Sequence, residues 1–175
     1  FAYRLKQGEK DRKFCEHAVS IVGEKKEKSA VPGLLKILAA EETSTPGDQH
    51  RSAAVKALVK IGDTSVVPAL MEAIDMDAGT SSDPIDKNTN RTNEEIAEAL
   101  GKMGDKKACG KLEKLMERSR YDYAVLKAIR SLGRLQCNDA VASISKVALK
   151  HENKFMRKNA VVALGDIGDL SATDT

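Results

Sequence analysis

Residues 50–63 read HRSAAVKALVKIGD, and this stretch decides the fold of the chain. Its apolar residues recur at steps of three and four, which places them on one face of a helix. Gly62 follows the last of them, where a glycine ends a helix readily because it tolerates the left-handed backbone conformation. The stretch therefore predicts a helix that buries one stripe of side chains and stops at a glycine-containing turn.

The same pattern returns along the whole chain. Residues 94–105 read EEIAEALGKMGD, residues 156–169 read MRKNAVVALGDIGD, and looser copies are AVSIVGE at 18–24 and AIRSLGR at 128–134. A repeat with intervals between 29 and 42 residues is typical of helical solenoids. The glycines that we place at the five turns are Gly23, Gly62, Gly104, Gly133 and Gly168.

A second apolar stripe follows each turn. Val31-Pro32-Gly33-Leu34 aligns with Val67-Pro68-Ala69-Leu70, and a proline in the first turn of a helix is tolerated because the amides there lack partners. The unit is therefore helix A, a turn and helix B. Stacking the hairpins buries a column that consists of Leu34, Leu70, Leu112 and Ile144.

These residues resemble the HEAT-like repeat family, in particular its short subtype of phycobilisome lyase subunits, with the signature VRxxAAxALGxIGD followed by AVPxL. The resemblance implies an all-α, right-handed α-solenoid (an α-α superhelix) with one domain over 1–175 and about five hairpins. Glu24 and Arg134 depart from the pattern, because the family has a turn aspartate there. The expected repeats are approximately 9–42, 50–76, 93–118, 122–150 and 155–175, the last incomplete.

Two connections between hairpins are longer than a tight repeat needs. Residues 41–49 read EETSTPGDQ and residues 75–93 read DMDAGTSSDPIDKNTNRTN, and both are rich in turn-forming residues. We interpret them as solvated loops, with partner-binding loops as the alternative. The acidic residues between 75 and 86 lack the glycine and the terminal glutamate of an EF-hand loop, so a solvated loop is preferred to a calcium site.

The last repeat would only begin its second helix at residues 170–175. Apolar residues of the preceding helix, Val161 and Ile167 among them, then lack half of their cover. We interpret this as truncation of a longer natural chain. The alternative is that this edge meets another molecule, which includes end-to-end self-association of two copies.

Composition excludes several classes of function. The chain has 29 Lys and Arg, 26 Asp and Glu, three Phe, three Tyr and no Trp. So small and dispersed a positive excess predicts a solvated surface and disfavours nucleic-acid binding, and the scarcity of aromatics argues against a base-stacking platform. No apolar run approaches the roughly 18 residues that span a bilayer.

Catalytic motifs are missing as well. The sequence contains no GxSxG, no GxxxxGKS/T and no GxGxxG. His17, His50 and His151 are scattered, so they do not form the repeated His-Glu pairs that bind iron in the HEAT-like deoxyhypusine hydroxylases. The sequence therefore predicts a protein that is not an enzyme, with no cofactor and no metal.

The three cysteines, Cys15, Cys109 and Cys137, form no CxxC pair. We interpret them as free thiols, with Cys15 and Cys109 on buried helix faces. Free thiols favour a reducing, cytoplasmic location, although a signal peptide upstream of Phe1 would not be visible.

The predicted function is a scaffold that binds a partner protein on a concave helical surface. We expect the B helices to form that surface, with a slight basic excess that favours an acidic partner segment. An auxiliary or chaperone subunit of a cofactor-attaching, lyase-type enzyme is the alternative, and nucleic-acid binding is less favoured. The contact residues predicted on the B helices are Lys36, Glu72, Lys111, Lys114, Lys146 and Lys150.

Overall fold

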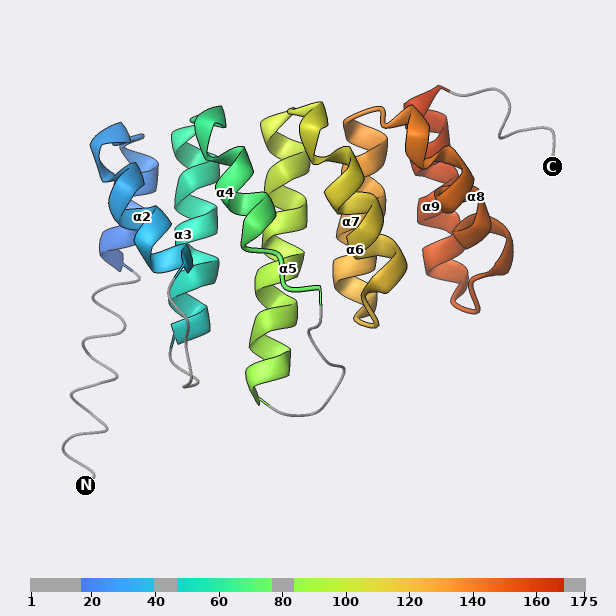
Figure 1. Cartoon of the computed structure of the whole chain (residues 1–175), viewed down its shortest axis with the longest axis horizontal. Coiled ribbons are helices and arrows are strands. Elements are labelled where there is room, and N and C mark those ends of the chain that lie inside the picture. The colour runs from blue at the N-terminus through green and yellow to red at the C-terminus, as the bar shows by residue number, and fades with distance from the viewer. Residues whose placement is uncertain (1–16, 40–46, 77–83, 169–175) are drawn as a thin grey trace.

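A computed structural model describes residues 17–39, 47–76 and 84–168, and the extended regular elements in these ranges are all helices (Figure 1). The A helices are residues 17–24, α3 (Gly47–Ile61), α5 (Pro84–Met103), α7 (Asp122–Arg134) and α9 (Lys154–Ile167). The B helices are α2 (Val31–Ala39), α4 (Val67–Glu72), α6 (Cys109–Arg118) and α8 (Val141–Lys150). The predicted all-α solenoid is confirmed.

The helices form two layers, with the B helices in front of the A helices in Figure 1. Consecutive A helices pack against one another, and each B helix packs chiefly against A helices. The core lies between the layers. The column predicted from Leu34, Leu70, Leu112 and Ile144 is buried there, as the spacing of the apolar residues requires.

Each A helix ends at a residue with left-handed backbone. Gly62, Gly104 and Gly168 occupy this position with φ of 74°, 78° and 73°. In the first and fourth repeats the corresponding residues are Lys26 and Gln136, both with φ of 52°. The assignment of Gly23 and Gly133 to these turns was therefore wrong, because each lies three residues earlier, inside its helix.

The residue after the left-handed position caps the short 3-10 helix that begins helix B. Asp63 Oδ1 accepts from the Ser65 amide at 3.0 Å, and Asp105 Oδ1 accepts from the Lys107 amide at 2.9 Å. Glu27 accepts from the Ser29 amide in the first repeat. Glu24 and Arg134 are thus not at the capping position. The 3-10 helices are η1 (Lys28–Ala30), η2 (Thr64–Val66), η3 (Lys106–Ala108) and η4 (Asn138–Ala140).

The fourth repeat has Cys137 at this capping position, where its side chain makes no capping hydrogen bond. Cys137 is instead bonded to Cys109, the first residue of α6, and the two Cα atoms are 5.7 Å apart. The prediction of free thiols was wrong for this pair, because only stacking brings the turn of one hairpin beside helix B of the hairpin before it. Cys15 lies outside the described residues. The argument for a reducing, cytoplasmic location loses its support.

Polar side chains anchor the chain where a B helix leads into the next A helix. Arg51 Nε donates to the carbonyl of Leu38 at 3.0 Å, at the end of α2. Arg157 Nη1 donates to the carbonyls of His151 and Glu152 after α8. These arginines are the R of the sequence stretches HRSAAV and MRKNAV, so the repeated pattern includes the residue that closes the turn.

The connection expected at 75–93 is partly helical, because α5 already begins at Pro84. Asn93 links the third repeat to the end of the second one. Its side chain accepts from the Asp75 amide at 3.0 Å and donates to the Asp75 carbonyl at 2.7 Å, which ties α5 to the end of the previous hairpin. The rest of this connection, residues 77–83, and most of the other one, residues 40–46, lie outside the described residues. So do residues 9–16 and 169–175 of the terminal repeats.

Candidate functional site: the A-helix surface

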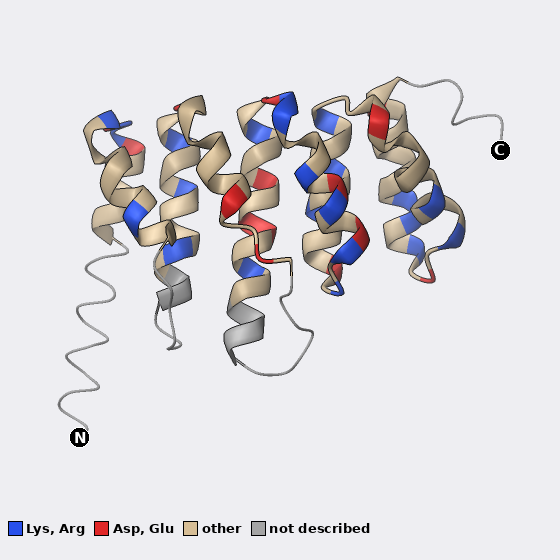
Figure 2. Ribbon diagram, viewed as in Figure 1, with Lys and Arg blue, Asp and Glu red and all other residues tan. Residues whose placement is uncertain are grey.

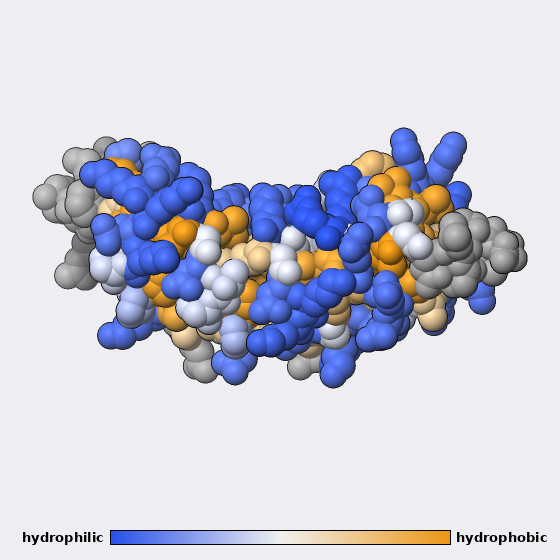
Figure 3. All heavy atoms as spheres, turned by 90° about the horizontal axis from the view of Figure 1, so that it is seen from above, coloured by the Kyte–Doolittle hydropathy of each residue, from blue (hydrophilic) through white to orange (hydrophobic). Residues whose placement is uncertain are grey.

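The solenoid curves toward its A helices. At three steps of the stack a glycine lies against a small residue of the next A helix, in the pairs Gly23–Ala57, Gly101–Ser131 and Gly133–Ala163. Close packing in one layer and looser packing in the other bends a stack toward the tight layer. Figure 3, seen from above, shows the hollow on the side opposite the B helices of Figure 1.

This finding corrects the predicted geometry, in which the B helices formed the concave surface. We call the hollowed side of the A helices the A face. A groove of about 700 Å³ opens on it, between residues 17–24, α3 and α5. The side chains that line the groove include Ser20, Ala53, Lys56, Lys60, Arg91, Glu95, Glu98 and Lys102.

One substitution in the repeat accounts for the place of this groove. Val59 of α3 stands where Gly23, Gly101 and Gly133 stand in their helices, three residues before the left-handed turn residue. A valine keeps two helix backbones farther apart than a glycine does. Val59 is half-buried and lines the groove, which thus opens at the step from α3 to α5.

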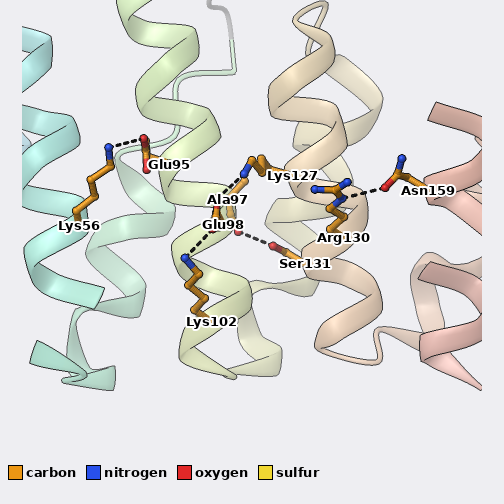
Figure 4. Close-up of polar contacts among 9 residues, drawn as sticks. All are labelled: Lys56, Glu95, Ala97, Glu98, Lys102, Lys127, Arg130, Ser131 and Asn159. Atoms are coloured by element: carbon orange, nitrogen blue, oxygen red, sulfur yellow. Dashed lines mark hydrogen bonds and ion pairs between the residues drawn. The ribbon is translucent and has the colours of Figure 1, made fainter. Parts of the chain in front are cut away.

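A ladder of polar contacts crosses the A face from helix to helix (Figure 4). Lys60 Nζ lies 3.3 Å from Glu24 Oε1, and Lys56 Nζ lies 2.9 Å from Glu95 Oε1. The next step pairs Lys127 of α7 with Glu98 of α5. In the last step Arg130 Nε donates to Asn159 Oδ1 of α9 at 2.9 Å. Each A helix in the described stack is therefore linked to the next one across the hollow.

Glu98 is the carboxylate of this ladder that pairs with two lysines. Its carboxylate pairs with Lys102 Nζ at 2.6 Å and also with Lys127. Hydrogen bonds from these two ammonium groups lower the pKa of Glu98 from 4.5 to about 2, because they stabilise the ionised form. Glu94, one turn earlier, differs: burial raises the pKa of its carboxyl group. The A face therefore stabilises a carboxylate at one specific place.

The A face becomes apolar toward α9. Val162 occupies the repeat position that holds Lys56, Glu98 and Arg130 in the preceding A helices, and 54% of it is exposed. Phe155 lies two turns earlier on the same side of α9 and is also 54% exposed. Tyr123, at the corresponding position of α7, is 59% exposed, and its ring lies against that of Tyr121. Exposed apolar groups gathered on a concave surface are typical of binding sites.

The contact residues predicted from the sequence lie on the opposite side. Lys36, Glu72, Lys114, Lys146 and Lys150 are exposed on the B helices, and Lys111 is half-exposed. Among these residues, Glu72 lines a second, smaller groove of about 320 Å³, between α2 and α4. Their part in binding a partner stays a prediction.

Sequence reasoning missed the side chains of the A-face ladder. The composition predicts only a solvated surface with dispersed charge, and the predicted contact residues are all on the B helices. The sequence did contain a signal, because the same repeat position carries opposite charges in successive A helices, as Lys56 of α3 and Glu98 of α5 do. Their pairing becomes visible only once the repeats are aligned on Lys26 and Gln136 in place of Gly23 and Gly133.

Figure 2 shows residues of both charges along the described stack. Within the described ranges, no cluster of three or more His, Cys, Asp or Glu side chains could hold a metal ion. The helices of the described residues include none with both the length and the apolar character to cross a membrane. Residues Asn90-Arg91-Thr92 match the N-glycosylation sequon, but Asn90 is only 3% exposed, so its side chain is not accessible for this modification in the fold.

Comparison with known proteins gives one finding on the family. Residues 4–81 match the family model for HEAT repeats. This range includes α2, α3 and α4, and the same hairpin recurs from α5 to α9 in the structure. None of the curated proteins matches the chain.

Proposed function

The chain is a solenoid of HEAT-like repeats, and on that premise we propose that it is a non-enzymatic scaffold that binds a partner protein along the A face. HEAT repeats are generally protein-interaction scaffolds and are typically non-catalytic. The proposal adds the surface. A stack of short helices presents side chains from every repeat to one elongated partner, which suits recognition of a segment better than chemistry on a small molecule.

The groove between residues 17–24, α3 and α5 is the observation that carries this proposal. It is hollow, it continues into the polar ladder, and an apolar patch lies at the other end of the same face. A charged region beside an exposed apolar anchor is the usual composition of a protein-binding surface. The B helices carry the alternative surface, centred on Lys111, Lys114 and Lys146.

Filling each surface separately tests the proposal. Ala53→Trp places a large ring in the groove without changing the charge, and Ala142→Trp adds the same ring to the exposed surface of α8. The full chain and both variants are cross-linked to bound proteins in a cell extract, and the cross-linked residues are identified by mass spectrometry. We expect cross-links from Lys56, Lys60 and Lys102 that Ala53→Trp removes and Ala142→Trp preserves.

Cross-links confined to Lys36, Lys114, Lys146 and Lys150 would instead assign binding to the B helices. Thermal unfolding of both variants controls for damage to the fold. The mass of the unlinked protein in solution tests end-to-end self-association, for which Val161 is the motivating residue. It is 59% exposed, whereas its counterparts Val55, Ala97 and Ile129 are buried by the next A helix.

A further inference from the structure

The groove of the A face has more positive than negative charge. Its lining includes Lys56, Lys60, Arg91 and Lys102, against the two carboxylates of Glu95 and Glu98. An ammonium group has three donors, and the side chains of Lys56 and Lys102 stay about half exposed in their ion pairs, at 52% and 49%. These lysines therefore keep donors for a further carboxylate.

Two arginines extend this positive region. Arg91 of α5 and Arg130 of α7 are exposed, and the described hydrogen bond of Arg130 uses Nε alone, with the neutral Asn159 as acceptor. A guanidinium group binds carboxylates through two parallel hydrogen bonds. Arg91 and Arg130 thus offer this geometry on consecutive A helices, on the same side as the groove.

The alternation of charges points to a protein segment. A nucleic acid would bring a continuous row of phosphates against Glu95 and Glu98, and these carboxylates would repel the phosphates. A peptide can place its acidic side chains at intervals, so that each meets a cation of the ladder. A chain in the extended polyproline II conformation advances about 3.1 Å per residue and presents every third side chain on the same side. Neighbouring packed helices lie about 8–10 Å apart, so about three residues correspond to one step of the stack.

The apolar end of the A face indicates that the partner segment also carries an apolar side chain. Val162 and Phe155 are exposed on α9, at the end of the line that runs over Lys56, Glu98 and Arg130. We propose that the A face binds an extended acidic segment of a partner protein, with acidic residues about three apart over α3, α5 and α7, and an apolar side chain held on Val162 and Phe155. This inference rests on the proposed scaffold function and specifies its partner.

A synthetic peptide with glutamate at every third position and phenylalanine at each end is the probe. Two control peptides replace the glutamates by glutamine or the phenylalanines by alanine. Titration into the full chain, followed by fluorescence anisotropy of the labelled peptide, is expected to give at least tenfold tighter binding for the glutamate peptide than for the glutamine peptide. The difference should shrink as salt is added, because exposed charges are screened.

Matched charge reversals locate the binding surface. Arg91→Glu with Arg130→Glu should weaken the peptide at least tenfold. Lys114→Glu with Lys146→Glu makes the same change in net charge on the B helices and should change the affinity less than threefold. Val162→Asp should weaken the phenylalanine peptide several-fold and leave the alanine peptide nearly unchanged.

Equal binding of the glutamate and glutamine peptides would overturn the inference, as would a loss caused only by the B-helix pair. A mixed-sequence DNA duplex that binds more tightly than the glutamate peptide would also overturn it. The proposed function is judged separately: if the cross-links on the A face persist while the acidic peptide fails to bind, the scaffold stands and the stated partner chemistry is wrong.

Discussion

Gly133→Ala tests the close packing of the A helices, from which the curvature and the A face follow. A Cβ atom at Gly133 would lie 2.8 Å from Ala163 Cα and 3.0 Å from Ala163 Cβ, well inside ordinary contact distance. Gly165 occupies the same repeat position of α9, but a Cβ atom there has no atom of the described residues within 4 Å. The two glycines therefore form a matched pair, one in contact with the next A helix and one without such a contact.

The expected free energies have opposite signs. Alanine stabilises a helix interior by about 1 kcal/mol relative to glycine, and this gain applies to both variants. Overpacking a tight contact costs about 1–3 kcal/mol, and this cost applies only to Gly133→Ala, since α7 and α9 must move apart. We expect Gly133→Ala to lower the free energy of unfolding by about 1 kcal/mol and Gly165→Ala to raise it by up to about 1 kcal/mol.

Thermal unfolding followed by circular dichroism measures the difference. For a chain of this size 1 kcal/mol corresponds to about 2–4 °C in Tm, so the two variants should differ by about 4–8 °C. Unchanged helix content in both variants controls for wider damage. If Gly133→Ala raises Tm as much as Gly165→Ala does, α7 and α9 are not in close contact, and the reasoning that the stack bends toward its A helices fails.

Two further predictions concern the disulfide bond and the ion pairs of Glu98. The Cys109–Cys137 bridge spans 28 positions of the sequence, and closing a loop of that length stabilises the folded state by about 3.6 kcal/mol. Reduction of the bridge should therefore lower the urea concentration at the midpoint of unfolding. Thiol titration of the denatured protein should find two fewer free thiols before reduction than after it. The lowered pKa of Glu98, about 2, means that its ion pairs stabilise the fold above its ordinary pKa of 4.5 and lose this effect as the pH falls toward 2. Glu98→Gln should therefore reduce the loss of Tm between pH 6 and pH 3, and an unchanged pH dependence would show that these ion pairs add nothing.

The hairpins and the residues of their core were predictable from the sequence, because helical spacing and turn chemistry mark them within each repeat. Leu70 and Leu112 are buried as their spacing required, and Gly62 and Gly104 end their helices in the left-handed conformation as expected. Spacing and turn chemistry are local properties, so they survive in a single sequence without any knowledge of the neighbouring repeats.

Contacts between repeats were not predictable in the same way. Gly23 and Gly133 look like turn glycines, because a glycine near the end of a helical stripe usually is one. Their actual role depends on Ala57 and Ala163, which are about 30 residues away in the chain. The Cys109–Cys137 bridge and the direction of curvature depend on the same stacking, so they could not be read from any one hairpin.

The A face and the packing of the A helices have a common origin. Where a glycine lets two helices approach, side chains on the exposed side of those helices also come within reach of one another. Gly101 against Ser131 accompanies the pair of Glu98 and Lys127, and Gly133 against Ala163 accompanies Arg130 and Asn159.

The step from α3 to α5 has Val59 in place of a glycine. The longer side chains of Lys56 and Glu95 still meet there, but the space beneath them stays open as the groove. Small changes at one buried position of the repeat therefore decide where this surface is closed by its own side chains and where it can admit a partner. In a solenoid of this kind, the place of a binding groove follows from the packing residue of each step as much as from the exposed residues that line it.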